Sequence, residues 1–154
     1  QMAEMGVVCG VSNKFDGLEK LPHFVEAAYA ACQYGKDERS GAGLYYYEDY
    51  MQVFYTAKAL ENTVPDIYIP SELIQVLDYD RERQSDYQKV LRGLLQNNMS
   101  ATDTAKKLYM HRNTVIHRAE RLKDYFGMDL DSYEYRVKLI HAFEVMDFMA
   151  VVKR

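Results

Sequence analysis

The chain has 154 residues, 48% of them hydrophobic, and a formal net charge of −4 at pH 7. This length suits one domain or two small ones, and the apolar fraction is sufficient for a packed core. The sequence contains no apolar run near the length of a membrane span and no signal peptide, which argues against a membrane protein. Cys9 and Cys32 have neither metal-site nor disulfide-framework spacing, so we interpret both as buried side chains in a reducing cytoplasm.

Strands and helices are predicted to alternate over the first sixty residues. Residues 5–12 are compact and partly β-branched, which is typical of a buried strand. Residues 18–34 follow a helical pattern whose predicted buried side is formed by Leu21, Phe24, Val25, Ala28 and Cys32. The segment 35–43, GKDERSGAG, is predicted to be a turn or exposed loop. A second strand at 43–47 and a helix at 48–61 complete a β-α-β-α order.

Two strands are too few for a sheet that is stable by itself. Because exposed strand edges invite pairing, we expect either upstream residues or a second copy of the chain to cover them. The chain begins with Gln1 inside what we interpret as a domain already under way, so we expect a C-terminal portion of a longer protein. Two interpretations of a tyrosine cluster stay open, namely stacking on a small molecule and packing in a core or interface. This cluster comprises Tyr45, Tyr46, Tyr47, Tyr50 and Tyr55.

Residues 62–72, NTVPDIYIPSE, contain two of the three prolines and are predicted to link two domains. Ser71 is predicted to cap a helix over residues 73–79. A further helix is expected at 85–96, as a support behind the segment that follows it. Its predicted buried face consists of Tyr87, Val90, Leu91, Leu94 and Leu95.

Residues 98–127 are predicted to form two short amphipathic helices joined by a tight turn. The first helix opens at Ser100, where the hydroxyl can cap free amides and Asp103 lies near the positive helix end. Its apolar stripe is predicted to consist of Ala105, Leu108 and Tyr109. The small side chain of Ala105 allows the two helices to approach closely at a steep angle.

The second helix is predicted from about Arg112 to Phe126. Its inward stripe is formed by Val115, Ala119, Leu122 and Phe126, and Gly127 is a plausible C-cap. We predict that its polar face contacts DNA through Arg112, Asn113, Thr114, His117, Arg118 and Arg121. Arg can bind a guanine edge, Asn an adenine edge, and Thr a thymine methyl group or a phosphate. We expect Ser100, Thr102, Lys106 and Lys107 to contact the DNA backbone.

The charge distribution supports this prediction. Residues 100–127 contain six Lys or Arg residues and three acids, a local balance of +3, which leaves −7 for the remainder of the chain. The acidic total therefore hides a basic segment of the kind that attracts nucleic acid. An ordinary helical hairpin with a solvated charged face is the alternative interpretation of the same pattern.

The string LLQNNMSATDTAKKLYMHRNTVIHRAERLKDYFGMDL, residues 94–130, resembles the C-terminal helix-turn-helix of the PucR/CdaR family of bacterial transcription regulators. That family includes sugar-diacid and purine-catabolism regulators. The matching residues are Leu94, Leu95, Asn97 or Asn98, Thr104, Ala105, His111 to Val115, Arg118, Gly127, Asp129 and Leu130. One departure is Ala119, where the family usually has Leu. The resemblance implies a sequence-specific DNA-binding protein.

Residues 1–61 resemble the tail of a GGDEF-like domain, which PucR/CdaR regulators often carry before the helix-turn-helix. The glycine-acid signature of a nucleotide cyclase is not in this chain, so cyclase activity is not expected. We therefore expect an α+β fold that is predominantly α, with a partial GGDEF-like region at 1–61, a linker at 62–72 and a helix-turn-helix domain at 73–154. The resemblance also implies that an upstream domain binds a small-molecule effector.

One long helix is predicted after Leu130, capped by Asp131 or Ser132. Its apolar residues exceed a single stripe, so they either all belong to the core or partly join a second subunit in a homodimer. They are Tyr133, Val137, Ile140, Phe143 and Met146 on one side, with Leu139, Val145, Phe148, Met149 and Val152.

We expect a DNA-binding transcription regulator whose partner is double-stranded DNA, with no enzymatic activity, metal or cofactor. The histidines lack zinc-site spacing, and no phosphate-binding glycine loop or nucleophilic serine motif occurs. The competing interpretation is a protein-interaction or ligand-sensing module that makes no direct contact with DNA.

Overall fold

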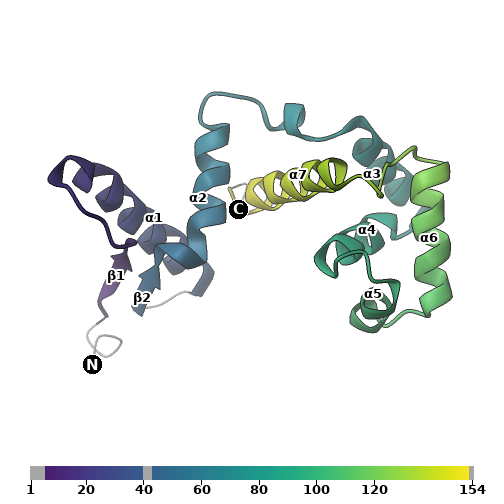
Figure 1. Ribbon diagram of the computed structural model, residues 1–154, viewed down its shortest axis with the longest axis horizontal. Coiled ribbons are helices and arrows are strands. Elements are labelled where there is room, and N and C mark those ends of the chain that lie inside the picture. Colours follow the sequence, from purple (N-terminus) through teal and green to yellow (C-terminus); the bar gives the residue numbers. More distant parts are fainter. Residues whose placement is uncertain (1–5, 40–42, 153–154) are drawn as a thin grey trace. The chain divides into compact units, whose positions relative to one another are not determined.

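The computed structural model describes residues 6–39 and 43–152. The chain divides into two compact units, Gln1–Thr63 and Val64–Arg154. The first unit contains both strands and two α-helices (Figure 1). The described residues of the second unit form helices and the loops between them. The α+β, predominantly helical class is therefore confirmed. Among the described residues, we find no helix that combines the length and apolar character needed to cross a membrane.

The first unit has the predicted β-α-β-α order. Strand β1 (Val8–Val11) pairs in parallel with β2 (Gly43–Tyr46), with Val8 opposite Gly43. Parallel neighbours require a crossover connection. That connection contains the 3-10 helix η1 (Leu18–Lys20) and helix α1 (Leu21–Arg39), and helix α2 (Tyr47–Leu60) follows β2.

The buried face predicted for α1 was partly wrong. Phe24, Ala28 and Cys32 are half-buried, but Leu21 and Val25 are 44% and 57% exposed, whereas Ala27, Ala30 and Ala31 are buried. Small side chains let α1 approach β1 and α2 closely, and a helix with apolar residues on several sides does not reveal by periodicity which side is covered. A second difference is that α1 continues through Gly35 to Arg39 instead of turning, and Gly35 lies close against the ring of Tyr45. Residues 40–42 of the predicted loop lie outside the described residues.

The tyrosine cluster and the cysteines have mixed environments. Tyr45 and Tyr50 are buried around Ala31, with their rings edge to face, and form the core of the first unit. Tyr46 and Tyr55 are exposed. Cys9 and Cys32 are free and half-buried rather than fully buried.

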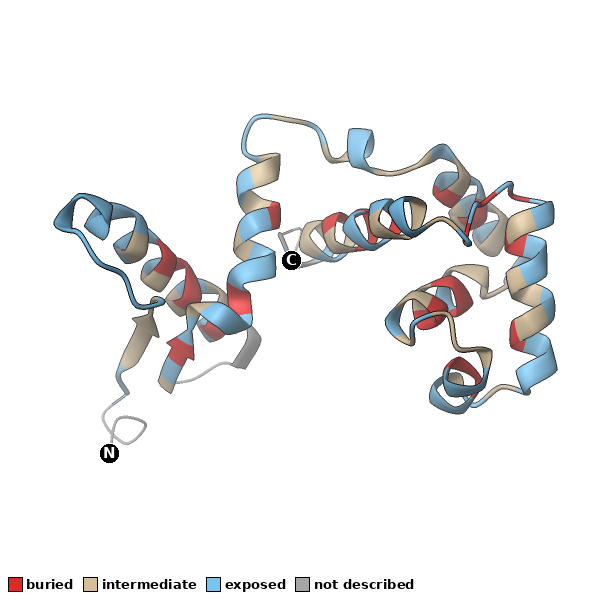
Figure 2. Ribbon diagram, viewed as in Figure 1, coloured by how far each residue is buried: buried red, intermediate tan, exposed pale blue. Residues whose placement is uncertain are grey.

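The second unit consists of a short 3-10 helix and five α-helices. These are η2 (Pro65–Tyr68), α3 (Ser71–Arg83), α4 (Tyr87–Gln96), α5 (Ala101–Leu108), α6 (Arg112–Asp124) and α7 (Tyr133–Val152). Its main core is built from α3, α4, α6 and α7, around Leu73, Leu91, Leu122 and Leu139. A second cluster joins Val90, Leu94, Ala105 and Val115 from α4, α5 and α6. Figure 2 shows buried residues concentrated on the inward sides of these helices.

Helix α4 is capped by a residue of the preceding helix. Asp80 accepts hydrogen bonds from the amides of Tyr87 and Gln88, at 2.9 and 2.7 Å, and from the hydroxyl of Ser85 at 2.6 Å. A carboxylate at this position satisfies two free amides and opposes the positive end of the helix dipole. The helix therefore begins at Tyr87, not at Ser85 as predicted.

Ser71 is the first residue of α3 and does not cap it. The capping position is Pro70, whose carbonyl accepts from the amide of Leu73 at 3.0 Å. The predicted buried face of α4 is confirmed in its centre, since Val90, Leu91 and Leu94 are at most 1% exposed.

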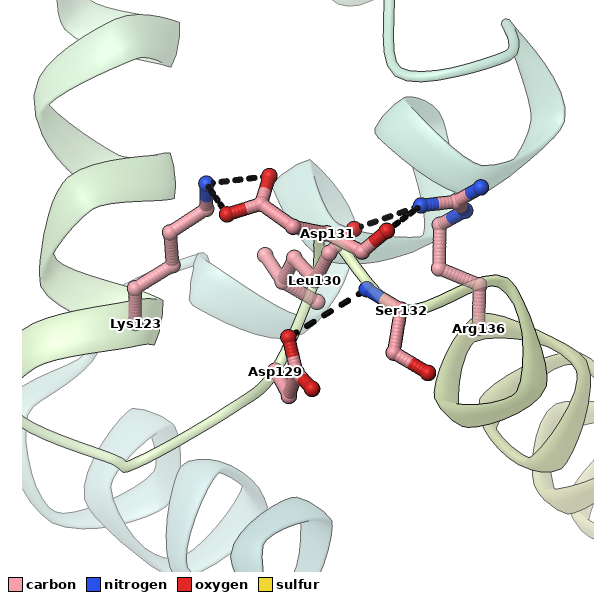
Figure 3. Close-up of polar contacts among 6 residues, drawn as sticks. All are labelled: Lys123, Asp129, Leu130, Asp131, Ser132 and Arg136. Carbon is pink, nitrogen blue, oxygen red and sulfur yellow. Dashed lines mark hydrogen bonds and ion pairs between the residues drawn. The ribbon is translucent and has the colours of Figure 1, made fainter.

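A loop with several internal hydrogen bonds connects α6 to α7 (Figure 3). Gly127 has φ +69°, which suits a glycine, and the amide of Met128 returns to the carbonyl of Leu122 at 3.1 Å, as in a helix C-cap. Asp129 accepts from the amide of Ser132 at 3.2 Å, and Leu130 is buried in the main core. These contacts explain why a Gly-x-Asp-Leu sequence follows α6.

Further contacts fix the start of α7. The ammonium group of Lys123 lies 2.7 Å from both carboxylate oxygens of Asp131, and Arg136 donates to the carbonyls of Leu130 and Asp131 (Figure 3). Ser132 accepts from the amide of Tyr135 at 3.2 Å, so the predicted cap at this residue is confirmed. On α7 the main core takes up Leu139, Ala142 and Phe143, whereas Tyr133 and Ile140 are 68% and 39% exposed. The side chain of Val152 is not described.

Replacing Asp80 with Ala should lower the free energy of unfolding of the second unit by about 1–3 kcal/mol, because three hydrogen bonds to a charged acceptor are lost. Urea unfolding followed by far-UV circular dichroism measures this change. The matched control is Asp78→Ala, which removes an exposed ion pair with Arg81 and should change stability by less than about 1 kcal/mol. Equal effects of the two substitutions would contradict the capping role of Asp80.

Candidate nucleic-acid interface

Helix α5 begins at a serine cap, as predicted. The hydroxyl of Ser100 accepts from the amide of Asp103 at 3.3 Å and donates to its carboxylate at 2.7 Å. The cap satisfies one of the free amides of the helix and places a negative charge at its positive end. The Ser100 hydroxyl, one of the predicted backbone contacts, is thus engaged with Asp103 in the free protein.

Close contact between α4 and α5 fixes the position of the two-helix segment. A Cβ atom added at Gly93 would lie 2.9 Å from Cγ2 of Thr104, which is fully buried. Glycine is therefore required for the spacing of these helices, despite its cost within a helix. Ala105 is 5% exposed in the cluster with Val90 and Val115, which places a small residue at the crossing as predicted.

Residues 109–111 form the turn between α5 and α6. Tyr109 was predicted to lie in the apolar stripe, but it is 96% exposed and has φ +56°. It ends α5 in the left-handed conformation, which turns its side chain out of the stripe. His111 then caps α6, since its Nδ1 accepts from the amide of Asn113 at 3.2 Å. The cap by His111 thus satisfies a free amide at the amino end of α6.

Two opposite stripes run along α6. Val115, Leu122 and Phe126 are buried and Ala119 is half-buried, so the predicted inward stripe is confirmed. Each residue two positions earlier lies roughly 200° around the helix. These positions hold Asn113, His117, Glu120 and Asp124, all of them exposed, and we call this set the outer ridge.

Arg118 lies on the flank of α6 that faces α4. Its guanidinium forms an ion pair with Asp86, lies 3.5 Å from the sulfur of Met110 and 5.9 Å from the ring centre of Tyr87. The side chains of Arg118 and Asp86 are 25% and 32% exposed, and Oδ1 of Asp86 is buried without a well-formed hydrogen bond. Arg118 therefore neutralises a buried charge within the domain, unlike its exposed neighbours.

The remaining predicted DNA contacts differ in how firmly they are held. Arg121 lies over the ring of Tyr125, at 4.8 Å, and its guanidinium reaches the hydroxyl of Tyr79 at 3.4 Å. Arg112 donates from Nε to Thr102 at 3.2 Å, which joins the first turns of α5 and α6. The other contacts pair Lys107 with Gln96 at 3.0 Å and Lys106 with Asp103 at 3.8 Å. Thr114 is exposed.

A depression of about 730 Å³ lies beside α6. It is lined by Tyr87, Thr114, His117, Arg118, Arg121, Asp124 and Tyr125. Sequence reasoning identified four of these residues but missed both tyrosines and Asp124. Within the described part of the chain, no group of three or more His, Cys, Asp or Glu side chains is arranged to hold a metal ion.

Glu120 of the outer ridge was not among the residues predicted to contact DNA. The 4, 3, 4 spacing of the outer ridge was available in the sequence, because it repeats that of the inward stripe two residues earlier. No pattern near Arg118 in the sequence predicts its ion pair with Asp86, because Asp86 lies 32 positions earlier in the chain.

Helices α5 and α6, the turn at 109–111 and the support of α4 define a helix-turn-helix domain. In agreement, residues 87–145 match the PucR C-terminal helix-turn-helix domain. The chain belongs to the PucR/CdaR family, as its resemblance in sequence implied.

Two characterised relatives are similar to most of this chain. The purine catabolism regulatory protein of Bacillus subtilis (strain 168) is 30% identical over 140 residues, which cover 84% of the chain and 24% of that protein. The carbohydrate diacid regulator of Escherichia coli (strain K12) is 25% identical over 139 residues, 88% of the chain and 34% of that protein. The chain thus spans about a quarter to a third of these relatives. No solved structure matches it significantly.

Replacing Arg118 with Ala should destabilise the second unit by about 1–3 kcal/mol, because the partly buried carboxylate of Asp86 loses its counter-charge. Thermal and urea unfolding of the variant would measure the loss. Arg112→Ala is the matched control, since it removes an arginine from the same helix whose described bond is exposed, and it should cost less than about 1 kcal/mol. An unchanged stability of the Arg118 variant would show that its ion pair contributes nothing.

Proposed function

We propose that this chain is the DNA-binding portion of a transcription regulator and that α6 reads the major groove of double-stranded DNA. The observation that carries the proposal is the arrangement of α6. Its inward stripe is buried against α3, α4, α5 and α7, while Asn113, Thr114 and His117 are exposed near its amino end. In helix-turn-helix proteins the amino-terminal residues of the second helix contact base edges, and the first helix crosses the backbone.

Charge supports the same orientation. The segment 100–127 carries +3 in a chain of net charge −4, and its exposed cations include Lys106 and Lys107 on α5 and Arg112 and Arg121 on α6. These side chains are suited to phosphate contacts on both sides of α6. Arg118 remains a proposed contact through the depression beside α6, where Arg121 and His117 are its neighbours.

The first unit is proposed to be a partial GGDEF-like region, at about residues 1–61, with residues 62–72 as the linker to a DNA-binding domain at 73–154. An effector-binding domain upstream and a homodimer belong to the same proposal. Two-fold dimers address half-sites about 34 Å apart, so dimerisation would give such a regulator its operator symmetry. The exposed residues Tyr133 and Ile140 of α7 are available for that contact. A protein of this kind acts on the chromosome, in the cytoplasm, without an enzymatic step.

Binding of the chain to random duplex DNA, measured by fluorescence anisotropy at two salt concentrations, tests the proposal. Affinity should fall steeply as salt rises, because cations of the protein displace counterions from the phosphates. Binding that is insensitive to salt, or no binding at low salt, would contradict DNA recognition. Either result would favour a module that docks a protein partner or senses a ligand.

Lys107→Ala should weaken binding to all duplex sequences alike and reduce the slope of log affinity against log salt by about 0.9, the value of one phosphate contact. The control is Lys138→Ala, which replaces an exposed lysine on α7, outside α5 and α6. A slope unchanged by the Lys107 substitution would remove this residue from the backbone contacts.

A further inference from the structure

The outer ridge of α6 carries two acids, which is unexpected for a surface that faces DNA. Glu120 and Asp124 follow Asn113 and His117 along this ridge and are exposed. Carboxylates are repelled by phosphates, so an acid on such a surface weakens binding unless it meets a hydrogen-bond donor. The contacts of such an acid within the protein therefore show whether its carboxylate is already paired with a cation.

Glu120 is set apart from several other acids of the domain. Asp86 pairs with Arg118, Asp103 with the capping Ser100, and Asp131 with Lys123. Glu120 instead contacts His117, another residue of the outer ridge, with Oε2 3.3 Å from Nδ1. Its side chain is 60% exposed, and His117 is 79% exposed. The contact keeps the carboxylate on the ridge rather than against a cation of the core.

Glu120 lies within reach of base edges if α6 enters the groove. It is eight residues after the first residue of the helix, or about 12 Å along the axis. The major groove is about 12 Å wide and admits a helix, so residues on its outward side approach the bases over several turns.

We propose that Glu120 is a base-reading residue that selects a cytosine in the operator. The inference rests on the proposed function and assigns one of its specificity determinants. The amino group of cytosine N4 donates a hydrogen bond into the major groove, where a carboxylate accepts it. Guanine presents two acceptors and thymine one acceptor with a methyl group, so both leave the carboxylate repelled and unpaired. Adenine has an amino donor as well, but its N7 acceptor lies beside that donor and repels a second carboxylate oxygen, which favours cytosine. Before DNA binds, the nearest described partner of this carboxylate is His117, at 3.3 Å.

The experiment begins with selection of a preferred duplex from a random library by the full chain. Affinities are then measured for that duplex, for its single-base variants and for random duplex. Glu120→Gln should bind random duplex more tightly than the unmodified chain, because a negative charge is removed. At one position its preference for cytosine should fall by roughly 5- to 150-fold and shift toward adenine, whose edge matches a glutamine amide.

Glu134→Gln is the matched control, since it makes the same charge change at an exposed residue of α7, outside α5 and α6. It should leave base preference unchanged. If Glu120→Gln behaves in that same way, Glu120 is a solvated acid and the inference is wrong. If the unmodified chain binds no duplex at low salt, the proposed function itself fails, which is a separate outcome visible before any variant is made.

Discussion

The packing of α4 against α5 is the constraint on which the position of α6 depends. Gly93 brings the two helices close enough for Thr104 to be buried, and Ala105 lets α6 enter the same cluster through Val115. Helix α6 then contributes Val115 to this cluster and Leu122 to the main core, so both ends of its inward stripe are covered. The capping of α4 by Asp80 and the hydrogen-bonded loop before α7 hold the outer helices around this centre.

Three sides of helix α6 have different surroundings. One side is core, a second is tied to α3 and α4 through Arg118 and Arg121, and the outer ridge makes few contacts with the rest of the domain. In the proposed complex with DNA, the arginines on this flank would lose little further side-chain freedom, because contacts within the domain already hold them.

Features that depend on neighbours in sequence were predictable from sequence. The serine cap of α5, the inward stripe of α6 and the glycine after it each follow a local sequence pattern, namely a capping residue, a helical period and a C-cap glycine. Features that depend on distant residues were not. The alanine face of α1 is buried because other elements of the first unit pack on it. Asp80 caps a helix that begins seven residues later. Arg118 forms an ion pair with Asp86, which lies far from it in the sequence. The prediction that Tyr109 lies in the apolar stripe of α5 was wrong for a local reason. Its left-handed backbone conformation interrupts the helical period on which that stripe was based.

Methylation protection by dimethyl sulfate tests most directly the claim that α6 reads the major groove. The reagent modifies N7 of guanine in the major groove and N3 of adenine in the minor groove, and both are probed in the same duplex. With the chain bound to its selected duplex, guanine N7 within the site should be protected and adenine N3 should stay reactive. Protection confined to adenine N3, or full reactivity of guanine N7 at saturating protein, would contradict the account.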